Sequence, residues 1–185
     1  MKTRFLMIFL VVSQISMAQS IKHGLTVHYG KSDFVAMKHP ADVSFSKLDY
    51  HLNAAIGYKF RLNYESKPYF IDFDLGLGLH KYRLWTGNEN AFSSGLSLLC
   101  YGSLGATYNY QIYKGLSAGA GIEPTLYYDN SYDIDFPLVA KISYDLKFIG
   151  VALMYKYGLT NALKVDSDIT KGKIRGWQVQ AFIPF

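Results

Sequence analysis

The sequence has few of the residues that usually stabilise small secreted domains. Only one cysteine, Cys100, occurs among 185 residues, so an internal disulfide is excluded. Five prolines and 18% charged residues leave neither a proline-rich linker nor a run of like charge. Because small secreted proteins without a large core are usually held by several disulfides, this chain needs another source of stability.

Long apolar runs are also scarce, and the longest lies near the start of the chain. Residues 5–12 are apolar throughout, but the run ends at Ser13, well short of the ~20 residues that a transmembrane helix needs. Lys2 and Arg4 precede the run, and the small-x-small sequence of residues 16–18 follows it. This order is typical of a cleaved secretory signal peptide.

We therefore predict a signal peptide over residues 1–18 and a single domain over residues 19–185. Gln19, not a cysteine, directly follows the cleavage site, so a lipoprotein anchor is not expected. Loss of Lys2 and Arg4 with the leader lowers the formal net charge from +5 to +3. The remaining basic residues are scattered along an exported chain, and we expect no nucleic-acid partner.

What the chain does contain favours β-strands. Half of the residues are hydrophobic, 16% are aromatic, and tyrosine and glycine each occur 16 times. Aromatic residues fit the pleated, half-buried surface of a sheet. The composition argues against both disorder and a long helical bundle.

Apolar and polar residues alternate along most of the chain, which places the two kinds on opposite faces of a strand. Each alternating segment has about the 9–11 residues that a tilted strand needs to cross a bilayer. Ile149–Tyr157 is the weakest segment, because Ala152 and Met154 dilute its polar face, and alone it could form a short helix. The predicted strands cover residues 23–29, 49–62, 69–80, 96–110, 116–126, 136–146, 149–157 and 176–185.

The connections between these segments are alternately long and short. The long connections are residues 31–47, 85–93, 129–135 and 160–173, and the short ones are residues 63–68, 111–115 and 147. Long loops on one side and short turns on the other are typical of an up-and-down meander with both chain ends on the short-turn side. The sequence predicts an all-β fold, an eight-stranded antiparallel up-and-down transmembrane β-barrel with a side-chain-filled lumen.

Alternation alone does not say which face is outside, and a soluble lipocalin-like ligand-binding barrel has the same meander. Two observations favour an apolar exterior. The aromatic residues of the apolar face gather at strand ends, as bilayer interfaces require. One predicted belt contains Tyr29, Tyr50, Tyr128, Phe136, Tyr155, Tyr157 and Trp177, and the other contains Phe60, Tyr69, Tyr108, Tyr110, Tyr144 and Phe185.

The second observation is that the polar face carries glycines and charges of both signs. Lys59 and Arg61 lie in the second predicted strand, and Asp72 and Asp74 lie in the third. We expect these charges to pair inside the lumen, because a buried charge without a partner is costly. An eight-stranded barrel has room inside only for side chains, so an open porin is not expected, although a narrow gated channel stays an alternative.

The chain resembles the OmpA/OmpX-like eight-stranded outer-membrane barrels, within the broad outer-membrane β-barrel domain family, over residues 20–185. The resemblance is carried by the aromatic terminal strand, residues 177–185, and by the strand exit Tyr155-Lys156-Tyr157-Gly158-Leu159-Thr160-Asn161. It implies a location in the Gram-negative outer membrane after export through the periplasm. It also implies contact with outer-membrane lipid and lipopolysaccharide, and a terminal strand recognised by the barrel-insertion machinery.

Some eight-stranded barrels are lipid-modifying enzymes, which would place a nucleophile and a base near the long loops. His51 and His80, with Asp49, Ser93 and Ser94, could form a triad on paper, but polar lumen fillers explain them better. The His-x-Ser signature of outer-membrane lipid A deacylases does not occur. We predict no catalytic residues and no enzyme.

Metal and cofactor sites are not expected either. His23 and His28 are five residues apart on a strand and face opposite sides, and His39 stands alone in a loop. Gly76 and Gly78 alternate within a strand instead of opening a helix, so they do not form a phosphate-binding loop. The glycines are expected to make room for inward side chains of neighbouring strands.

What remains is a non-enzymatic outer-membrane scaffold that presents surface loops. The first loop carries Phe34, Val35, Met37 and Phe45, which could form a patch for an extracellular ligand or pack over the barrel mouth. We expect the function to depend on residues 31–47 or 160–173. A lipid-modifying enzyme, a narrow gated channel and the lipocalin-like barrel are the alternatives.

Overall fold

The structure is a computed structural model, and it confirms the all-β architecture. It describes residues 20–38, 45–64, 67–88, 91–129, 131–161, 163–165 and 170–185. The predicted signal peptide, residues 1–18, lies outside the described residues, as does His39. No helix among the described residues combines the length and the apolar character that crossing a membrane requires.

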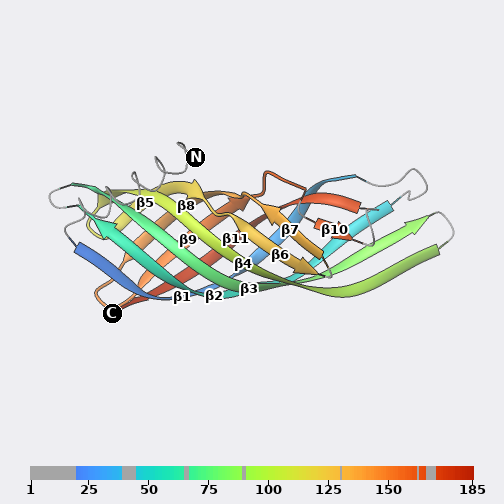
Figure 1. The fold of residues 1–185 in the computed structure, drawn as a ribbon, viewed down its shortest axis with the longest axis horizontal. Coiled ribbons are helices and arrows are strands. Elements are labelled where there is room, and N and C mark those ends of the chain that lie inside the picture. Colours follow the sequence, from blue (N-terminus) through green and yellow to red (C-terminus); the bar gives the residue numbers. More distant parts are fainter. Residues whose placement is uncertain are drawn as a thin grey trace, which may run out of the picture.

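The described residues form eleven strand segments arranged around an elongated molecule (Figure 1). In chain order they are β1 (Ser20–Lys38), β2 (Phe45–Asn63), β3 (Tyr69–Asn88), β4 (Ala91–Tyr113), β5 (Leu116–Ile122), β6 (Thr125–Asp129), β7 (Ser131–Asp135), β8 (Leu138–Asp145), β9 (Gly150–Tyr157), β10 (Leu163–Val165) and β11 (Thr170–Pro184).

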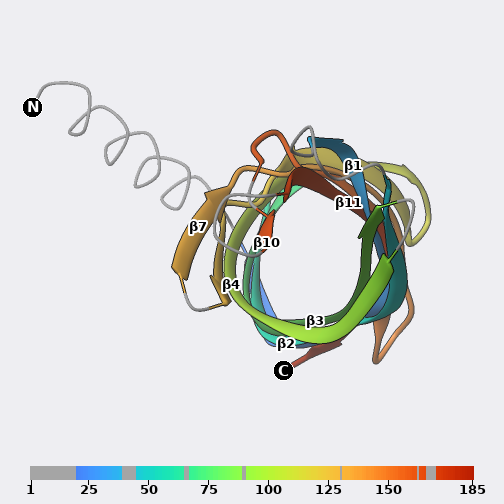
Figure 2. The same cartoon turned by 90° about the vertical axis from the view of Figure 1, so that its right-hand side faces the viewer.

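The strands pair in antiparallel fashion and close into a ring (Figure 2). The first strand β1 pairs with β2 on one side and with the last strand β11 on the other, and β3 pairs with β4. Two of the barrel strands are each made of two consecutive segments: β5 continues into β6, and β7 continues into β8. Counted in this way, the barrel has the eight strands that the sequence predicts. Closure removes the exposed edges that make open sheets associate.

Two prolines divide the fifth and sixth crossings into pairs of segments. Pro124 separates β5 from β6, and Pro137 separates β7 from β8, because proline has no N–H to donate to the ladder. Their carbonyl groups still accept hydrogen bonds, from the N–H of Leu104 to Pro124 at 2.9 Å and from that of Glu123 to Pro137 at 2.9 Å. The predicted continuous strand 116–126 is therefore interrupted, and β7 stands away from the ring (Figure 2).

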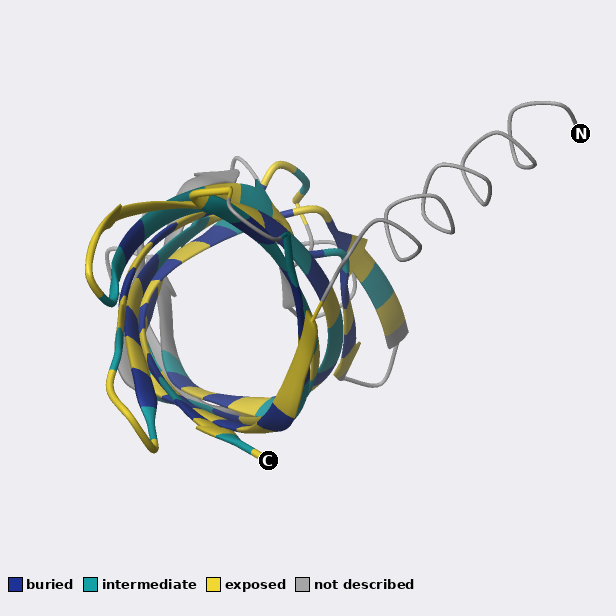
Figure 3. Ribbon diagram, turned by 90° about the vertical axis from the view of Figure 1, so that its left-hand side faces the viewer, coloured by how far each residue is buried: buried dark blue, intermediate teal, exposed yellow. Residues whose placement is uncertain are grey.

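The apolar face is outside, as the aromatic belts indicate. Buried and exposed residues alternate along the wall of the barrel (Figure 3). Leu77 and Ile56 are 70% and 67% exposed, whereas Lys59 and Asp72 are 2% and 0% exposed. This is opposite to the arrangement of a lipocalin-like barrel. β9 shows the same alternation, with Val151 and Leu153 exposed, so the weakest predicted segment is a strand.

The long connections contain more strand than the sequence predicts. β1 continues to Lys38 and β2 begins at Phe45, so most of the predicted loop 31–47 is paired backbone. Phe34, Val35 and Met37 therefore occupy strand positions, although their side chains lie outside the described set. The other three predicted loops also contain strand. The end of β3 and the start of β4 lie within residues 85–93, β7 lies within residues 129–135, and β10 and the start of β11 lie within residues 160–173.

The short-turn end of the barrel agrees with the prediction. β4 and β5 are joined at Lys114-Gly115, where Gly115 has a φ of 77° that an L side chain rarely adopts. The start of β1 lies beside the end of β11, and the N–H of Phe185 donates to the carbonyl of His23 at 2.8 Å. Both ends of the barrel domain therefore lie on the short-turn side.

A charge introduced into the outer face should be tolerated or rejected according to its depth. Leu77 and Tyr113 are equally exposed, at 70%, but Leu77 lies midway along β3 and Tyr113 lies beside the short turns. Leu77→Arg should cost about 2–4 kcal/mol in a bilayer, and Tyr113→Arg about 0–1 kcal/mol. Urea unfolding in lipid vesicles, followed by the gel shift between boiled and unboiled protein, measures the difference. Equal, small costs would show that the outer face meets water.

Candidate functional site

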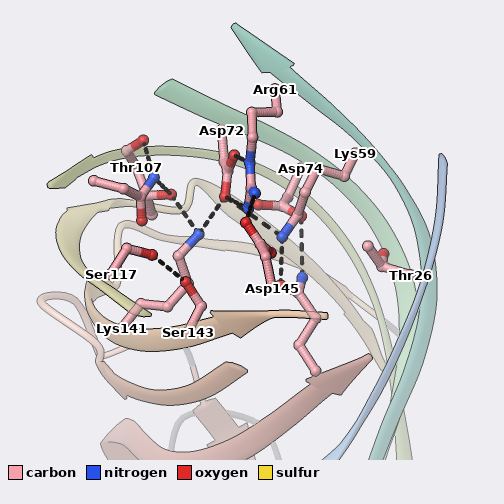
Figure 4. Close-up of polar contacts among 12 residues, drawn as sticks. Thr26, Lys59, Arg61, Asp72, Asp74, Thr107, Ser117, Lys141, Ser143 and Asp145 are labelled. Atoms are coloured by element: carbon pink, nitrogen blue, oxygen red, sulfur yellow. Dashed lines mark hydrogen bonds and ion pairs between the residues drawn. The ribbon is translucent and has the colours of Figure 1, made fainter. Parts of the chain in front are cut away.

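The half of the lumen next to the short turns is filled by charged side chains from three strands, β2, β3 and β8 (Figure 4). We call this group the ionic layer and define it by Lys59, Arg61, Asp72, Asp74, Lys141 and Asp145. The register places Arg61 of β2 opposite Asp72 of β3, and Lys59 opposite Asp74. The predicted pairing between the second and third strands is therefore confirmed.

Asp72 is the centre of the ionic layer and has no solvent exposure. The guanidinium of Arg61 donates to both of its carboxylate oxygens, Nε to Oδ1 at 2.7 Å and Nη2 to Oδ2 at 3.2 Å. Lys141 donates to Oδ2 at 2.7 Å, and Lys59 lies 3.5 Å from the same oxygen. Such charge-assisted and bidentate bonds are the strong ones in proteins, and burial raises the cost of losing any of them.

The remaining members complete a network that is neutral overall. Arg61 also donates to Asp145, and Lys59 lies 3.6 Å from Asp74. Gln180 of β11 joins these two, accepting from Lys59 at 2.6 Å and donating to Asp74 at 3.0 Å. Three cations thus face three carboxylates within the ionic layer as defined, which is what burial of charge requires.

Two buried aromatic rings, those of Phe70 and Phe182, contact the cations of the ionic layer. The guanidinium carbon of Arg61 lies 4.1 Å from the ring centre of Phe70 and 5.6 Å from that of Phe182. The ammonium of Lys59 lies 5.1 Å from the Phe182 ring. These cation–π contacts stabilise the charges where water is excluded.

The other half of the lumen, toward the long hairpins, contains a hydrophobic cluster. We call it the aromatic layer, and it consists of Ala55, Tyr82, Leu99, Tyr101, Tyr127 and Ile174. His80 packs against Tyr101 and Tyr127, with ring centres 4.8 and 5.8 Å apart. The hydroxyl of Tyr101 donates to Asn53 at 3.0 Å, so its polar end is satisfied inside the barrel.

One glycine makes room for this layer in the way that the sequence predicts. A Cβ added at Gly78 would overlap the ring of Tyr101 from the neighbouring strand. At Gly121, by contrast, a Cβ would meet the backbone carbonyl of Ala106. Inward glycines therefore serve both the packing of side chains and the close approach of strands in a narrow barrel.

A second, partly buried ion pair lies beside the aromatic layer. Lys156 of β9 donates to Glu123 at 2.6 Å. The cavity beside this pair, also lined by His80 and Gln178, measures about 20 Å³, which is room for about one water molecule. The Oε1 atom of Gln178 has no protein partner, and a water in this cavity would satisfy it.

The strand exit at residues 155–161 is fixed by a buried aspartate. Asp135, at the end of β7, accepts hydrogen bonds from the N–H of Thr160 at 2.8 Å and from its hydroxyl at 2.7 Å. A Cβ at Gly158 would overlap the other oxygen of this carboxylate. This contact could not be predicted from the sequence, because Asp135 and Thr160 belong to two different predicted loops.

The residues considered for a triad are not assembled by the backbone. His80 pairs with Leu99, whereas Ser94 and Ser93 pair with Trp85 and Thr86, five and six positions further along β3. At about 3.3 Å per residue this is a separation of roughly 17–20 Å along the strand. The side chains of Asp49, His51, Ser93 and Ser94 lie outside the described set.

His23 and His28 face opposite sides of β1, as the sequence predicts. His23 is exposed and its Nδ1 lies 2.6 Å from the Tyr58 hydroxyl, whereas His28 is buried with Nε2 near Thr26 and Gln180. Among the described residues, no group of three His, Cys, Asp or Glu side chains is close enough to hold a metal ion.

The ionic layer should carry much of the folding stability, with Asp72 contributing most. Asp72→Asn leaves Arg61 and Lys141 without their shared carboxylate and should cost about 3–5 kcal/mol. Asp74→Asn removes weaker contacts at a partly exposed position and should cost about 1 kcal/mol. Unfolding in detergent micelles measures both.

A double variant separates ion pairing from a general failure to fold. Adding Lys141→Met to Asp72→Asn removes one uncompensated cation and should recover part of the lost stability. Strictly additive losses would contradict the network described above.

The glycine beside Tyr101 provides an independent test of the aromatic layer. Gly78→Ala should cost about 1–3 kcal/mol through overpacking against the Tyr101 ring. Gly105→Ala is the matched control, because Gly105 also faces the lumen but the atom nearest to an added Cβ, in Glu123, is 3.5 Å away. The control should be neutral or stabilising by up to about 1 kcal/mol. Equal losses in thermal unfolding would contradict the packing.

Solved outer-membrane proteins have a similar fold. No protein-family model and no curated protein matches the chain. Among solved structures, the outer membrane protein OprG from Pseudomonas aeruginosa superposes with a TM-score of 0.52 at 11% identity, covering 89% of this chain and 94% of that chain. Ail, the attachment invasion locus protein of Yersinia pestis, gives a TM-score of 0.46 at 15% identity, covering 89% of this chain and 98% of that chain.

A second structure of Ail, in complex with the heparin analogue sucrose octasulfate, gives a TM-score of 0.45 at 12% identity and covers 90% of this chain. The chain has the fold of an eight-stranded outer-membrane β-barrel, and the resemblance drawn from its terminal strand is confirmed at the level of the fold. Identities this low carry no information about ligands or activity.

Proposed function

We propose that the protein is an integral outer-membrane barrel with a closed lumen, which acts as a non-enzymatic scaffold and presents its long hairpins at the cell surface. The observation that carries the proposal is the neutral ionic layer across the lumen, centred on the fully buried Asp72.

The apolar character of the outer face supports a location in the membrane. Large apolar side chains cover it from β1 to β11, and an open hollow of about 820 Å³ on this face is lined by residues such as Leu25, Ile56 and Leu104. In water this surface would associate, whereas acyl chains cover it in a bilayer. Tyr29, Tyr128 and Trp177 lie exposed toward the hairpins, and Tyr108 and Tyr144 toward the short turns, as two interfacial belts.

Export and assembly follow from the same proposal. Residues 1–18 would direct the chain to the periplasm and be removed. The aromatic terminal strand β11, which pairs with β1 to close the barrel, would be the segment that the insertion machinery recognises. An extracellular ligand would then bind at the hairpins formed by β1–β2, β3–β4 and β10–β11.

A scaffold with a closed lumen should not conduct ions. In planar bilayers the wild-type protein should show no steady single-channel steps, because side chains fill the lumen. Lys59→Ala with Asp74→Ala removes one opposed pair without changing the net charge and should introduce measurable conductance. Lys114→Ala, at an exposed turn, is the control and should change nothing. Large, steady steps from the unmodified protein would overturn the proposal in favour of a channel.

An enzymatic role has its own signature. Loss of a lipid A modification on deletion of the gene, restored by the wild type but not by His80→Ala, would establish the lipid-modifying alternative. The proposal predicts an unchanged lipid A profile, because the buried His80 packs against the rings of Tyr101 and Tyr127 as a filler of the lumen.

A further inference from the structure

We propose that the outer face of β1 and β11, at the hairpin end of the membrane, binds the phosphorylated headgroup of an outer-leaflet glycolipid. The inference rests on the proposed membrane location and adds a specific lipid site to it.

The site lies at the boundary between the exposed aromatic side chains of the hairpin-side belt and the basic residues beyond them. Trp177 of β11 is exposed, and its ring centre lies 4.8 Å from that of Tyr155 on β9. Lys31 of β1 pairs directly with Trp177, and Arg175 lies two residues further toward the hairpins. Together with Asp33 they line an open cavity of about 370 Å³, which is large enough for a phosphate with part of a sugar ring. The two cations at this cavity outnumber its one carboxylate.

The position of these cations on the outer face points to a lipid headgroup. A lysine or arginine on the lipid-facing side is costly at mid-membrane and costs almost nothing at the interface. Lys31 and Arg175 therefore mark the level at which the hydrocarbon ends. Arginine and lysine are the side chains that bind phosphate, and the aromatic pair below can pack against the sugar or the first methylenes.

The register beyond the cavity adds a second, independent observation. Lys171 of β11 pairs with Lys38 of β1 on one side and with Lys164 of β10 on the other. The backbone register therefore places three lysines at neighbouring positions beyond the cavity, which adds positive charge to this end of the sheet. Among the described residues of these strand ends the acidic one is Asp33, opposite Arg175.

The sequence between β10 and β11 also contains Asp166 and Asp168, outside the described residues. The lysine positions lie further from the membrane than the cavity, at the level of a phosphorylated core sugar. Cavity and lysines together therefore suit a ligand with several phosphates along the membrane normal, as lipopolysaccharide has. A soluble sulfated glycan is the competing ligand and is one of the outcomes below.

The experiment uses the fluorescence of Trp177 in the refolded mature chain. The chain has two tryptophans, so Trp85→Phe leaves Trp177 as the reporter at the cavity. Bisphosphorylated lipid A in detergent micelles should change its emission with an affinity on the order of tenfold higher than that of chemically dephosphorylated lipid A. The affinity should fall as salt is added.

Matched variants assign the effect to the site. Lys31→Gln with Arg175→Gln should lower the affinity for lipid A on the order of tenfold or more. Lys67→Gln with Lys114→Gln removes the same charge at the short-turn end and should leave the affinity unchanged. Equal binding of dephosphorylated lipid A, or equal loss in both double variants, would overturn the proposal.

Tighter binding of a soluble sulfated oligosaccharide or of inorganic phosphate than of lipid A would also overturn it, because the site would then not be one for lipid. If lipid binding fails while the protein still inserts and does not conduct, the scaffold function stands and only the lipid site is lost.

Discussion

The mutual neutralisation of charges inside a narrow lumen is the constraint on which the structure depends. Eight strands enclose a space that side chains fill, so every inward charge must find its partner within the barrel. Asp72 meets this demand by accepting from Arg61 and Lys141 together. Because these contacts join β2, β3 and β8, they also fix the strand register, in which a shift of one residue would exchange the two faces.

The same constraint explains why the two halves of the lumen differ. Next to the short turns, charged side chains reach across the lumen from opposite walls. Toward the hairpins the space is taken by rings such as Tyr101 and Tyr127, which need only one polar partner each. Lys156 and Glu123 form a separate neutral pair beside this region. A barrel without a disulfide can therefore be stable, because polar networks and aromatic packing connect its walls.

The sequence predicts the crossing strands well, because burial on one face imposes period-two alternation on residues such as Leu75 and Ile56. It also predicts that Lys59 and Arg61 pair with the aspartates of the neighbouring strand, since all of them lie on the inward face. The long hairpins could not be predicted, because strands beyond the bilayer have two wet faces and need no alternation. β1 accordingly continues to Lys38 although its pattern fades after Tyr29.

The aromatic layer could be predicted only in part from the sequence. The inward position of Tyr127 follows from its place between the outward Leu126 and Tyr128, but which rings meet depends on the stagger of non-adjacent strands. The contact of Asp135 with Thr160 was hidden for the same reason. Both features bear on the proposed function: paired hairpins and fixed strand exits give the outward surface a set shape, and a set shape lowers the entropy that any ligand must overcome on binding. Under the proposed function, the barrel would therefore favour ligand binding by holding this surface in place.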